Sequence, residues 1–469
     1  MSDPIKLTVL DITFHERAVR LRMPFRFGVV TLTEAPQLFV TARVRLADGR
    51  EGIGMSADVL APKWFDKSPD LSNEDNFEQL RGAARIAARL YCAETTPRAP
   101  FDLHADLDAE HRAACDAAGY PGLVASFGSA TVDRAILDAA LRLTGLSLFA
   151  GARANAFGLS DRLTPDLAGF DLAGFLAGLE PSPQIAARHT VGLVDPITAA
   201  DLTPEARVDD GLPQTLDEVI ATYGVDHFKL KVGGDLEADL DRLRAIARVL
   251  DTLPTYVATL DGNEQYSDVA GIVELWRAIS ADPDLARLCD AIRFIEQPIA
   301  RSAALQADIE TLAALKPVEI DESDDGLDAF PRAIALGYTG VSSKSCKGLY
   351  RALLNAARCA ARNAEAGAPK YFMSAEDLTT QAGLAVQQDL ALATLIGCTH
   401  VERNGHHYVH GMTGASDAEQ AAFLAAHPDL YHRPGDIALV RIEAGRLGIG
   451  SLDTPGLGSA VLPDVEAGP

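Results

Sequence analysis

Charged residues stand at the ends of six short apolar runs in the second half of the chain. A carboxylate or an ammonium group at the end of an otherwise apolar strand has no packing role there, so each is a candidate for chemistry. The six residues are Lys231, Asp261, Glu296, Asp321, Lys344 and Glu376. Neighbouring members of the series are 23 to 35 residues apart, which is the length of one strand and one helix. If the strands lie side by side, all six side chains reach one site.

The three acids Asp261, Glu296 and Asp321 would repel one another if adjacent strands brought them together without a counter-ion. A divalent cation removes this cost, and an all-oxygen ligand set favours Mg²⁺, or Mn²⁺, over zinc. Capping of the following helix is the alternative role for any single acid. Three acids in sequential register favour the metal site.

Two lysines share one face of an expected strand, because Lys229 and Lys231 are two residues apart. Inside a barrel, burial beside a metal ion lowers the pKa of a lysine toward the range of a general base. We expect Lys231 to carry the proton and Lys229 to be its electrostatic neighbour. Lys344 is the second candidate base, and Lys347 ranks behind it because it lies further into the following loop.

Metal and lysine together indicate removal of a proton α to a carboxylate. An amine cannot remove so weakly acidic a proton unless a cation stabilises the enediolate that forms. A second lysine on the other face can return the proton there, as in a racemase, an epimerase or a cycloisomerase. The same enediolate can instead lose a β-leaving group, so a lyase is the alternative. A barrel that binds metal without turnover is a third possibility, which the two lysines disfavour.

The elements that must position these residues alternate between strand and helix after residue 185. Strands are expected at Phe228–Val232, Tyr256–Leu260, Ile292–Ile295, Val318–Ile320, Gly340–Ser343 and Tyr371–Ser374, with a first near Arg188–Val194 and a last near His400–Arg403. Amphipathic helices are expected at Leu236–Leu250, Tyr350–Ala364 and Thr379–Ile396. Alternation implies parallel pairing, and eight strands suit an α/β fold of the (β/α)8 TIM-barrel type over residues 185–435. The carboxyl ends of such strands converge on one rim.

The first 150 residues have a different pattern. Residues 5 to 60 alternate between apolar and polar positions, as in an antiparallel sheet. Three helical patterns follow, at Asn76–Ala93, His104–Ala118 and Ala130–Thr144. We therefore expect an α+β capping domain over residues 1–150, joined by the C-terminal tail 436–469, with a linker or insertion over residues 151–184.

The composition disfavours several classes of partner. With 66 acidic and 42 basic residues, the formal net charge is −24, which disfavours nucleic acids and anionic membranes. The six cysteines form no CxxC pair, so neither a zinc cluster nor a disulfide framework is indicated. The sequence has neither a secretory leader pattern nor an apolar stretch of about 18 residues. We expect a cytoplasmic protein that acts on a small carboxylate.

In this order, the motifs resemble the enolase superfamily and, within it, the muconate lactonizing enzyme branch of the mandelate racemase/muconate lactonizing enzyme family. The motifs are Lys-x-Lys at Lys231, Asp-x-Asn at Asp261, Glu-Gln-Pro at Glu296, Asp-Glu-Ser at Asp321 and a lysine at Lys344. The resemblance covers nearly the whole chain and implies a modified (β/α)7β barrel. It also implies that the three acids hold the metal, that the two lysines form the acid/base pair, and that the protein is a homo-oligomer.

Further residues follow from the resemblance. Asn263 and Glu322 would support the metal ligands, and the segment Pro24–Ala35 resembles the capping loop that shapes the substrate pocket. The candidate substrate contacts are Phe25, Phe27, Thr31, Glu376 and His406. Glu376 could instead cap the next helix, and His406 could instead make ordinary loop hydrogen bonds.

Two departures from relatives narrow the reaction. The eighth strand, Val401-Glu402-Arg403, lacks the Asp-x-Asp with which dipeptide epimerases hold an ammonium group. The seventh has no counterpart of the histidine base of mandelate racemase. The resemblance therefore favours a lysine-based isomerase, with a syn-eliminating dehydratase of the o-succinylbenzoate synthase type as the alternative.

Overall fold

The computed structural model describes residues 3–27, 30–378 and 381–465. Its N-terminal part is an antiparallel sheet in the order β1-β2-β3. The strands are β1 (Leu7–Phe27), β2 (Val30–Leu46) and β3 (Glu51–Val59). Three long helices follow: α1 (Asn73–Ala93), α2 (Pro100–Ala117) and α3 (Gly122–Thr144). The predicted antiparallel sheet followed by three helices is confirmed.

Helix α3 is the central element of this part because it is buried along most of its length. Every residue of Leu123–Leu141 is buried, and the helix contacts β2, β3, α1 and the short turn Ser345–Lys347 of the barrel. At Gly54 of β3, a Cβ atom would lie 2.1 Å from the backbone nitrogen of Ala139, so only glycine allows this close approach. The helix begins at Gly122 rather than at the expected Ala130, since a helix buried on all sides has no amphipathic period to mark its start.

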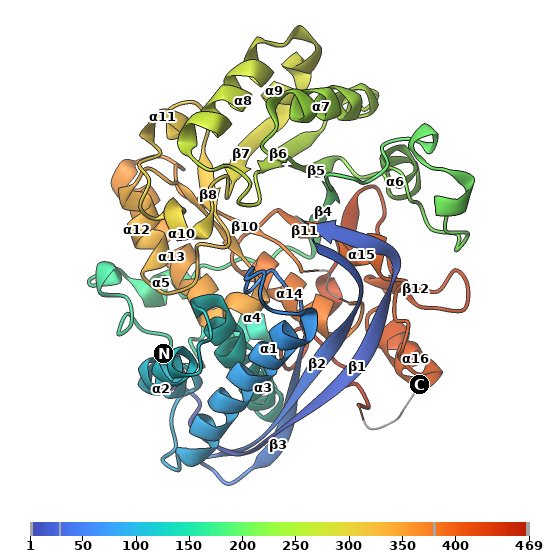
Figure 1. Cartoon of the computed structure of the whole chain (residues 1–469). Helices are drawn as coiled ribbons and strands as arrows, with labels where there is room; N and C mark the ends of the chain where they lie inside the picture. Colours follow the sequence, from blue (N-terminus) through green and yellow to red (C-terminus); the bar gives the residue numbers. More distant parts are fainter. Residues whose placement is uncertain (1–2, 28–29, 379–380, 466–469) are drawn as a thin grey trace.

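Eight parallel strands form a closed barrel beside the N-terminal part (Figure 1). They follow one another in chain order around the barrel, and the last strand pairs with the first. The strands are β4 (Gln184–Val191), β5 (His227–Lys231), β6 (Val257–Asp261), β7 (Ile292–Glu296), β8 (Val318–Ile320), β9 (Gly340–Ser343), β10 (Phe372–Ala375) and β11 (His400–Arg403). The predicted TIM barrel with an N-terminal cap is confirmed, and each strand lies within a few residues of its expected place.

Helices join successive barrel strands. They are α6 (Leu216–Tyr223), α7 (Leu236–Leu250), α8 (Val269–Ala281), α9 (Ala286–Ala291), α10 (Arg301–Ala304), α11 (Glu310–Ala313), α12 (Ala329–Ala335), α13 (Leu349–Ala366) and α14 (Leu384–Leu395). Helix α7 has the predicted bounds. Helix α14 begins at Leu384, directly after Gly383, whose φ of 104° turns the chain there. The expected start at Thr379 lies outside the described residues.

Shorter elements link the barrel to the rest of the chain. Residues 148–184 contain α4 (Leu148–Arg153) and α5 (Leu172–Ala177). After β11 come α15 (Gly405–Tyr408), α16 (Asp417–Ala426), the hairpin β12 (Tyr431–His432) and β13 (Leu439–Val440), and β14 (Arg446–Gly448). Strand β14 pairs antiparallel with β4 of the barrel. Further along the tail, the backbone N–H of Gly456 donates to the carbonyl of Leu146. Leu462 packs against an apolar cluster formed by residues of β2, β3 and α14.

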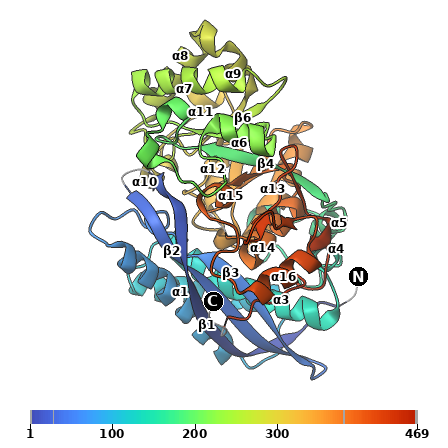
Figure 2. The ribbon, with the colours of Figure 1, turned by 90° about the vertical axis from the view of Figure 1, so that its right-hand side faces the viewer.

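The two parts meet over a broad contact. In Figure 2, the N-terminal sheet lies together with α1 and α3 in the lower part of the view, and the barrel lies above them. One end of the long β1–β2 hairpin reaches the barrel, where β1 contacts α15. Within the described ranges, no helix combines the length and the apolar character needed to cross a membrane.

A buried ion pair within the N-terminal part is also hydrogen-bonded to the barrel, and its loss should destabilise the protein. Arg134 of α3 pairs with Asp58 and donates to Gln388 of α14 over 3.1 Å. Replacing Arg134 by methionine leaves a buried carboxylate unpaired, so the free energy of unfolding in urea should fall by about 3–5 kcal/mol. Arg85→Met removes a more exposed ion pair and should cost at most about 1 kcal/mol. Equal losses in both variants would contradict the prediction.

Candidate active site

The carboxyl ends of the barrel strands meet in one pocket, as their register requires. Lys231 is paired with Asp261, and Asp261 with Glu296, across neighbouring strands. The pocket has an empty volume of about 640 Å³. Its lining residues are Phe25, Leu32, Val59, Ala61, Trp64, Lys67, Lys229, Lys231, Asn263, Asp321, Lys344, Glu376, Asp377, Leu378, Glu402 and Asn404.

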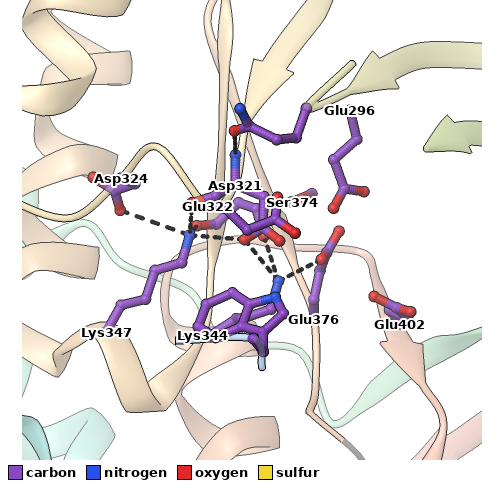
Figure 3. A network of polar contacts seen from close by, with 12 residues as sticks. Glu296, Asp321, Glu322, Asp324, Lys344, Lys347, Ser374, Glu376 and Glu402 are labelled. Carbon is purple, nitrogen blue, oxygen red and sulfur yellow. Dashed lines mark hydrogen bonds and ion pairs between the residues drawn. The ribbon is translucent and has the colours of Figure 1, made fainter. Parts of the chain in front are cut away.

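Lys229 lies at the centre of the charged cluster. Its Nζ atom is 2.7 Å from Glu296 and 2.9 Å from each of Asp261, Glu376 and Glu402. Three of these carboxylates lie on β6, β7 and β11, and the fourth follows β10. A single ammonium group therefore forms ion pairs with residues from four strands of the barrel. Glu376 and Glu402 are among the groups in Figure 3.

The two candidate bases lie on opposite sides of the barrel. Lys231 ends β5 and Lys344 follows β9, and three strands separate β5 from β9 in either direction. Lys231 pairs with Asp261, whereas the Nζ atom of Lys344 lies 2.7 Å from Asp321 and 2.6 Å from Glu376 (Figure 3). A molecule held between the two strands would present one face to each lysine.

Lys344 has two further neighbours. Its ammonium group lies 5.2 Å from the centre of the Trp64 ring, within the range of a cation–π contact. Lys347, the competing base, is buried and donates to the backbone carbonyls of Asp321 and Ser342 over 2.7 and 2.8 Å. Lys347 therefore holds the backbone beside the site, and Lys344 is the one that lines the pocket.

The electrostatics of the lysines differ from the expectation. Burial lowers the pKa of Lys231, but the carboxylate of Asp261 raises it, and the net result is a pKa above the usual value. The pKa of Lys344 is raised well above its usual value in the same way, by Asp321 and Glu376 against the effect of burial. The expected lowering assumed that a cation balances these acids, whereas in the protein alone the acids act on the lysines directly.

The acids have the properties of a site for a cation. Burial and the charges of Asp261 and Glu376 raise the pKa of Glu296 well above its usual value, and the Oε2 atom of Glu296 has no hydrogen-bond partner among the described residues. Burial and Glu376 raise the pKa of Glu319 to about 8, and within the part of the chain that the structure describes its Oε2 atom also lacks a hydrogen-bond partner. Buried carboxylates with unsatisfied oxygens are costly unless a positive charge joins them. An oxygen-only donor set of this kind fits Mg²⁺.

Two overlapping sets of acids can be distinguished. The predicted set is Asp261, Glu296 and Asp321. In the described part of the chain, the carboxylate oxygens that lie within 4.8 Å of one another belong to Glu296, Glu319 and Glu376. The sets share Glu296, and the other two predicted acids, Asp261 and Asp321, pair with Lys231 and Lys344.

The predicted supports of the metal ligands lie beside them. The side-chain amide of Asn263 donates to Glu322 over 2.9 Å, and its backbone N–H donates to Asp261 over 2.6 Å. Lys67, which follows β3, pairs with Glu264 and lies 4.0 Å from Glu322. A residue of the N-terminal part thereby contacts the groups that surround the predicted metal ligands.

Arg301 fixes the loop that carries Trp64 and Lys67. It donates to the backbone carbonyl of Trp64 over 2.9 Å and to that of Phe65 over 3.3 Å, and it pairs with Glu264 over 2.8 Å. The loop is thus attached to the barrel through its main chain.

The candidate substrate contacts are only partly brought together. Phe25 lines the pocket, and its ring centre lies 4.4 Å from that of Tyr408 in α15. Glu376 also lines it. Thr31 is exposed and is not among the lining residues, and the side chain of Phe27 lies outside the described residues. His406 lines a separate cavity, where its Nε2 atom is 3.3 Å from Nδ1 of His189.

Sequence reasoning missed several residues of the site. Glu402 is the last residue but one of β11, close to the strand end where the other charged residues lie, so that pattern could have included it. Glu319 lies two residues before Asp321, and the two-residue period used for the lysines would have found it. Trp64 and Lys67 lie in an irregular loop that carries no periodic signal.

Comparison with known proteins places the fold. Residues 212–464 match the family model described as enolase C-terminal domain-like, which is more than half of the chain. No curated protein matches. Similar solved structures include a mandelate racemase/muconate lactonizing protein from Herpetosiphon aurantiacus, with 18% identity, a TM-score of 0.59, and coverage of 96% of this chain and 98% of the other.

Two further structures show the same likeness. An enolase from Bradyrhizobium, complexed with magnesium and mandelic acid, is 18% identical with a TM-score of 0.59 and coverage of 97% of this chain and 96% of the other. A dipeptide epimerase from Enterococcus faecalis V583, complexed with Mg and a dipeptide, is 16% identical with a TM-score of 0.57 and coverage of 96% and 99%. The fold, the family model and the predicted motifs agree, and the chain belongs to the enolase superfamily through its enolase C-terminal domain-like barrel.

Proposed function

We propose that this protein is an Mg²⁺-dependent enzyme that removes the proton α to a carboxylate and returns it, as a racemase, epimerase or cycloisomerase does. The observation that carries the proposal is the placement of Lys231 and Lys344 on opposite sides of one pocket, each beside an acid. In this proposal, residues 185–435 form the catalytic barrel and residues 151–184 link it to a cap. The cap consists of residues 1–150 and the tail 436–469.

Asp261, Glu296 and Asp321 would hold Mg²⁺, which supplies positive charge to the substrate carboxylate as negative charge develops there. Lys231 then accepts the α-proton on one face, and Lys344 delivers a proton on the other. A lysine must be neutral to accept a proton. Once the negative charge of the acids is balanced, burial dominates at Lys231 and favours the neutral form.

The direct test is exchange of the α-proton in D₂O, followed by NMR and mass spectrometry over N-acylamino acids, muconates and sugar acids. Isomers that carry deuterium support the isomerase. Loss of water instead would identify a lyase that uses the same two lysines. A protein that exchanges no member of these classes would contradict the proposal.

Removal of the metal should abolish exchange. A cation contributes several kcal/mol to stabilising the developing charge, so treatment with EDTA should lower the exchange rate by on the order of 10³-fold. Added Mg²⁺ should restore the rate, and added Ca²⁺ serves as a comparison because its larger radius suits more ligands. Full exchange in the metal-free protein, verified by elemental analysis, would exclude the proposed role of the acids.

A further inference from the structure

The pocket has an apolar wall opposite its charged floor. The wall comes from three separate parts of the chain: the β1–β2 hairpin, the end of β3 with the loop after it, and the segment after β10. Its residues are Phe25, Leu32, Val59, Ala61, Trp64 and Leu378. Four of them are buried, with exposed fractions of 4% for Leu32 and Val59, 6% for Trp64 and 8% for Ala61. The wall is therefore a built surface and not a chance exposure of apolar side chains.

The charged groups around this wall are matched within the protein. Lys67 pairs with Glu264 and Asp377 pairs with Arg403. Glu402 pairs with Lys229 over 2.9 Å. A charged substituent on a substrate would have to displace one of these ion pairs. A polar substituent would lose its hydrogen bonds to water at the apolar surface and gain none in return.

The wall begins next to the reacting groups. The Trp64 ring lies 5.2 Å from the ammonium group of Lys344, so a substrate whose α-carbon lies between the two lysines has its substituent beside this ring. The charged floor, with its lysines and acids, then binds the carboxylate of the substrate. The apolar wall contacts the α-substituent.

On this basis, and resting on the proposed function, we infer that the substrate is a monocarboxylate whose α-substituent is uncharged and apolar, either aliphatic or aromatic. Leu32 and Trp64 are the residues of the wall that determine this specificity. In an apolar pocket, one methylene group changes kcat/KM by about 10–200-fold, so preferences of this size are expected along a homologous series.

The inference is tested by the ranking of substrates in the exchange assay. Two series are used, N-acetylamino acids and 2-hydroxy acids, each carrying isobutyl, benzyl, carbamoylethyl, aminobutyl or carboxyethyl substituents. The isobutyl and benzyl members should exceed the carbamoylethyl member in kcat/KM by at least about 10-fold, and the charged members by more. Faster exchange of a charged member would overturn the inference alone. Absence of exchange across both series, with exchange of a muconate or a sugar acid, would overturn the inference and leave the proposed function standing. Absence of exchange across all of these classes would contradict the proposed function and the inference with it.

A charge placed in the wall should change the ranking. Leu32→Glu offers a carboxylate to the substituent, so the ratio of isobutyl to aminobutyl rates should fall by about 100-fold. Ile53→Glu is the control, because Ile53 is 47% exposed and does not line the pocket, and its ratio should stay unchanged. An unchanged ratio in a folded Leu32→Glu variant would overturn the inference. If that variant does not fold, the ranking of the wild-type protein decides the question.

Discussion

Loss of isomerisation is the expected result when either Lys231 or Lys344 is replaced by alanine. General acid–base groups contribute about 10²–10⁴-fold to the rate, and each lysine serves one face of the substrate. We therefore expect each variant to exchange the α-proton of one enantiomer about 10²–10⁴-fold more slowly. Both variants should lose the interconversion of the two enantiomers. Exchange of the separate enantiomers in D₂O measures this directly.

Metal binding separates a chemical role of these lysines from a structural one. Lys231 pairs with Asp261, and Lys344 with Asp321, so removal of either ammonium group leaves an acid more negative. The affinity for Mn²⁺, measured by electron paramagnetic resonance, should stay the same or increase. Lys370→Ala is the matched control, because Lys370 is exposed, precedes the start of β10 and does not line the pocket. Unimpaired interconversion in both lysine variants would contradict the mechanism.

The second large effect concerns the metal ligands. Asp321→Asn removes one of the three proposed carboxylate ligands and should weaken Mn²⁺ binding by at least about 100-fold, since supporting residues alone account for 10–100-fold in other sites. Calorimetric titration of the metal-free protein measures this loss. Exchange activity at a fixed Mg²⁺ concentration should fall with it and recover in part at higher concentrations.

Glu319→Gln provides a matched comparison on the same strand. Glu319 lies two residues before Asp321, is buried, and belongs to the alternative set of adjacent acids with Glu296 and Glu376. If the proposed ligands are right, Glu319→Gln retains most of the affinity for Mn²⁺, because it removes none of the proposed ligands. The opposite order of the two variants would assign the metal to the alternative set.

The charged half of the site could be predicted from the sequence because its residues follow regular strands. Each of Lys231, Asp261 and Asp321 lies at or just after the end of a strand. Because the strands of the barrel are parallel, their carboxyl ends all lie on the same rim. The pKa values of the lysines could not be predicted in the same way. They depend on which carboxylates lie within about 3 Å of each ammonium group, which is a property of the packed site.

The apolar half could be predicted only in part: Phe25 and the segment Pro24–Ala35, which contains Leu32, are expected at the pocket from the sequence, whereas Trp64 is not. Trp64 and Lys67 lie in an irregular loop, and a bond from Arg301, more than 230 residues away, fixes their position. The early start of α3 escaped prediction for a related reason, because a helix buried on every side shows no amphipathic pattern. Both failures concern positions that tertiary contacts determine.

The attachment of this loop through Arg301 has a consequence for how the protein can change. Because Arg301 donates to the backbone carbonyls of Trp64 and Phe65, replacing the pocket-lining side chain of Trp64 removes neither hydrogen bond. Side-chain atoms of this loop contact the substrate, and main-chain atoms hold the loop in position. New substrates could therefore be acquired by point substitutions at the pocket surface, each tried without loosening the loop that presents it.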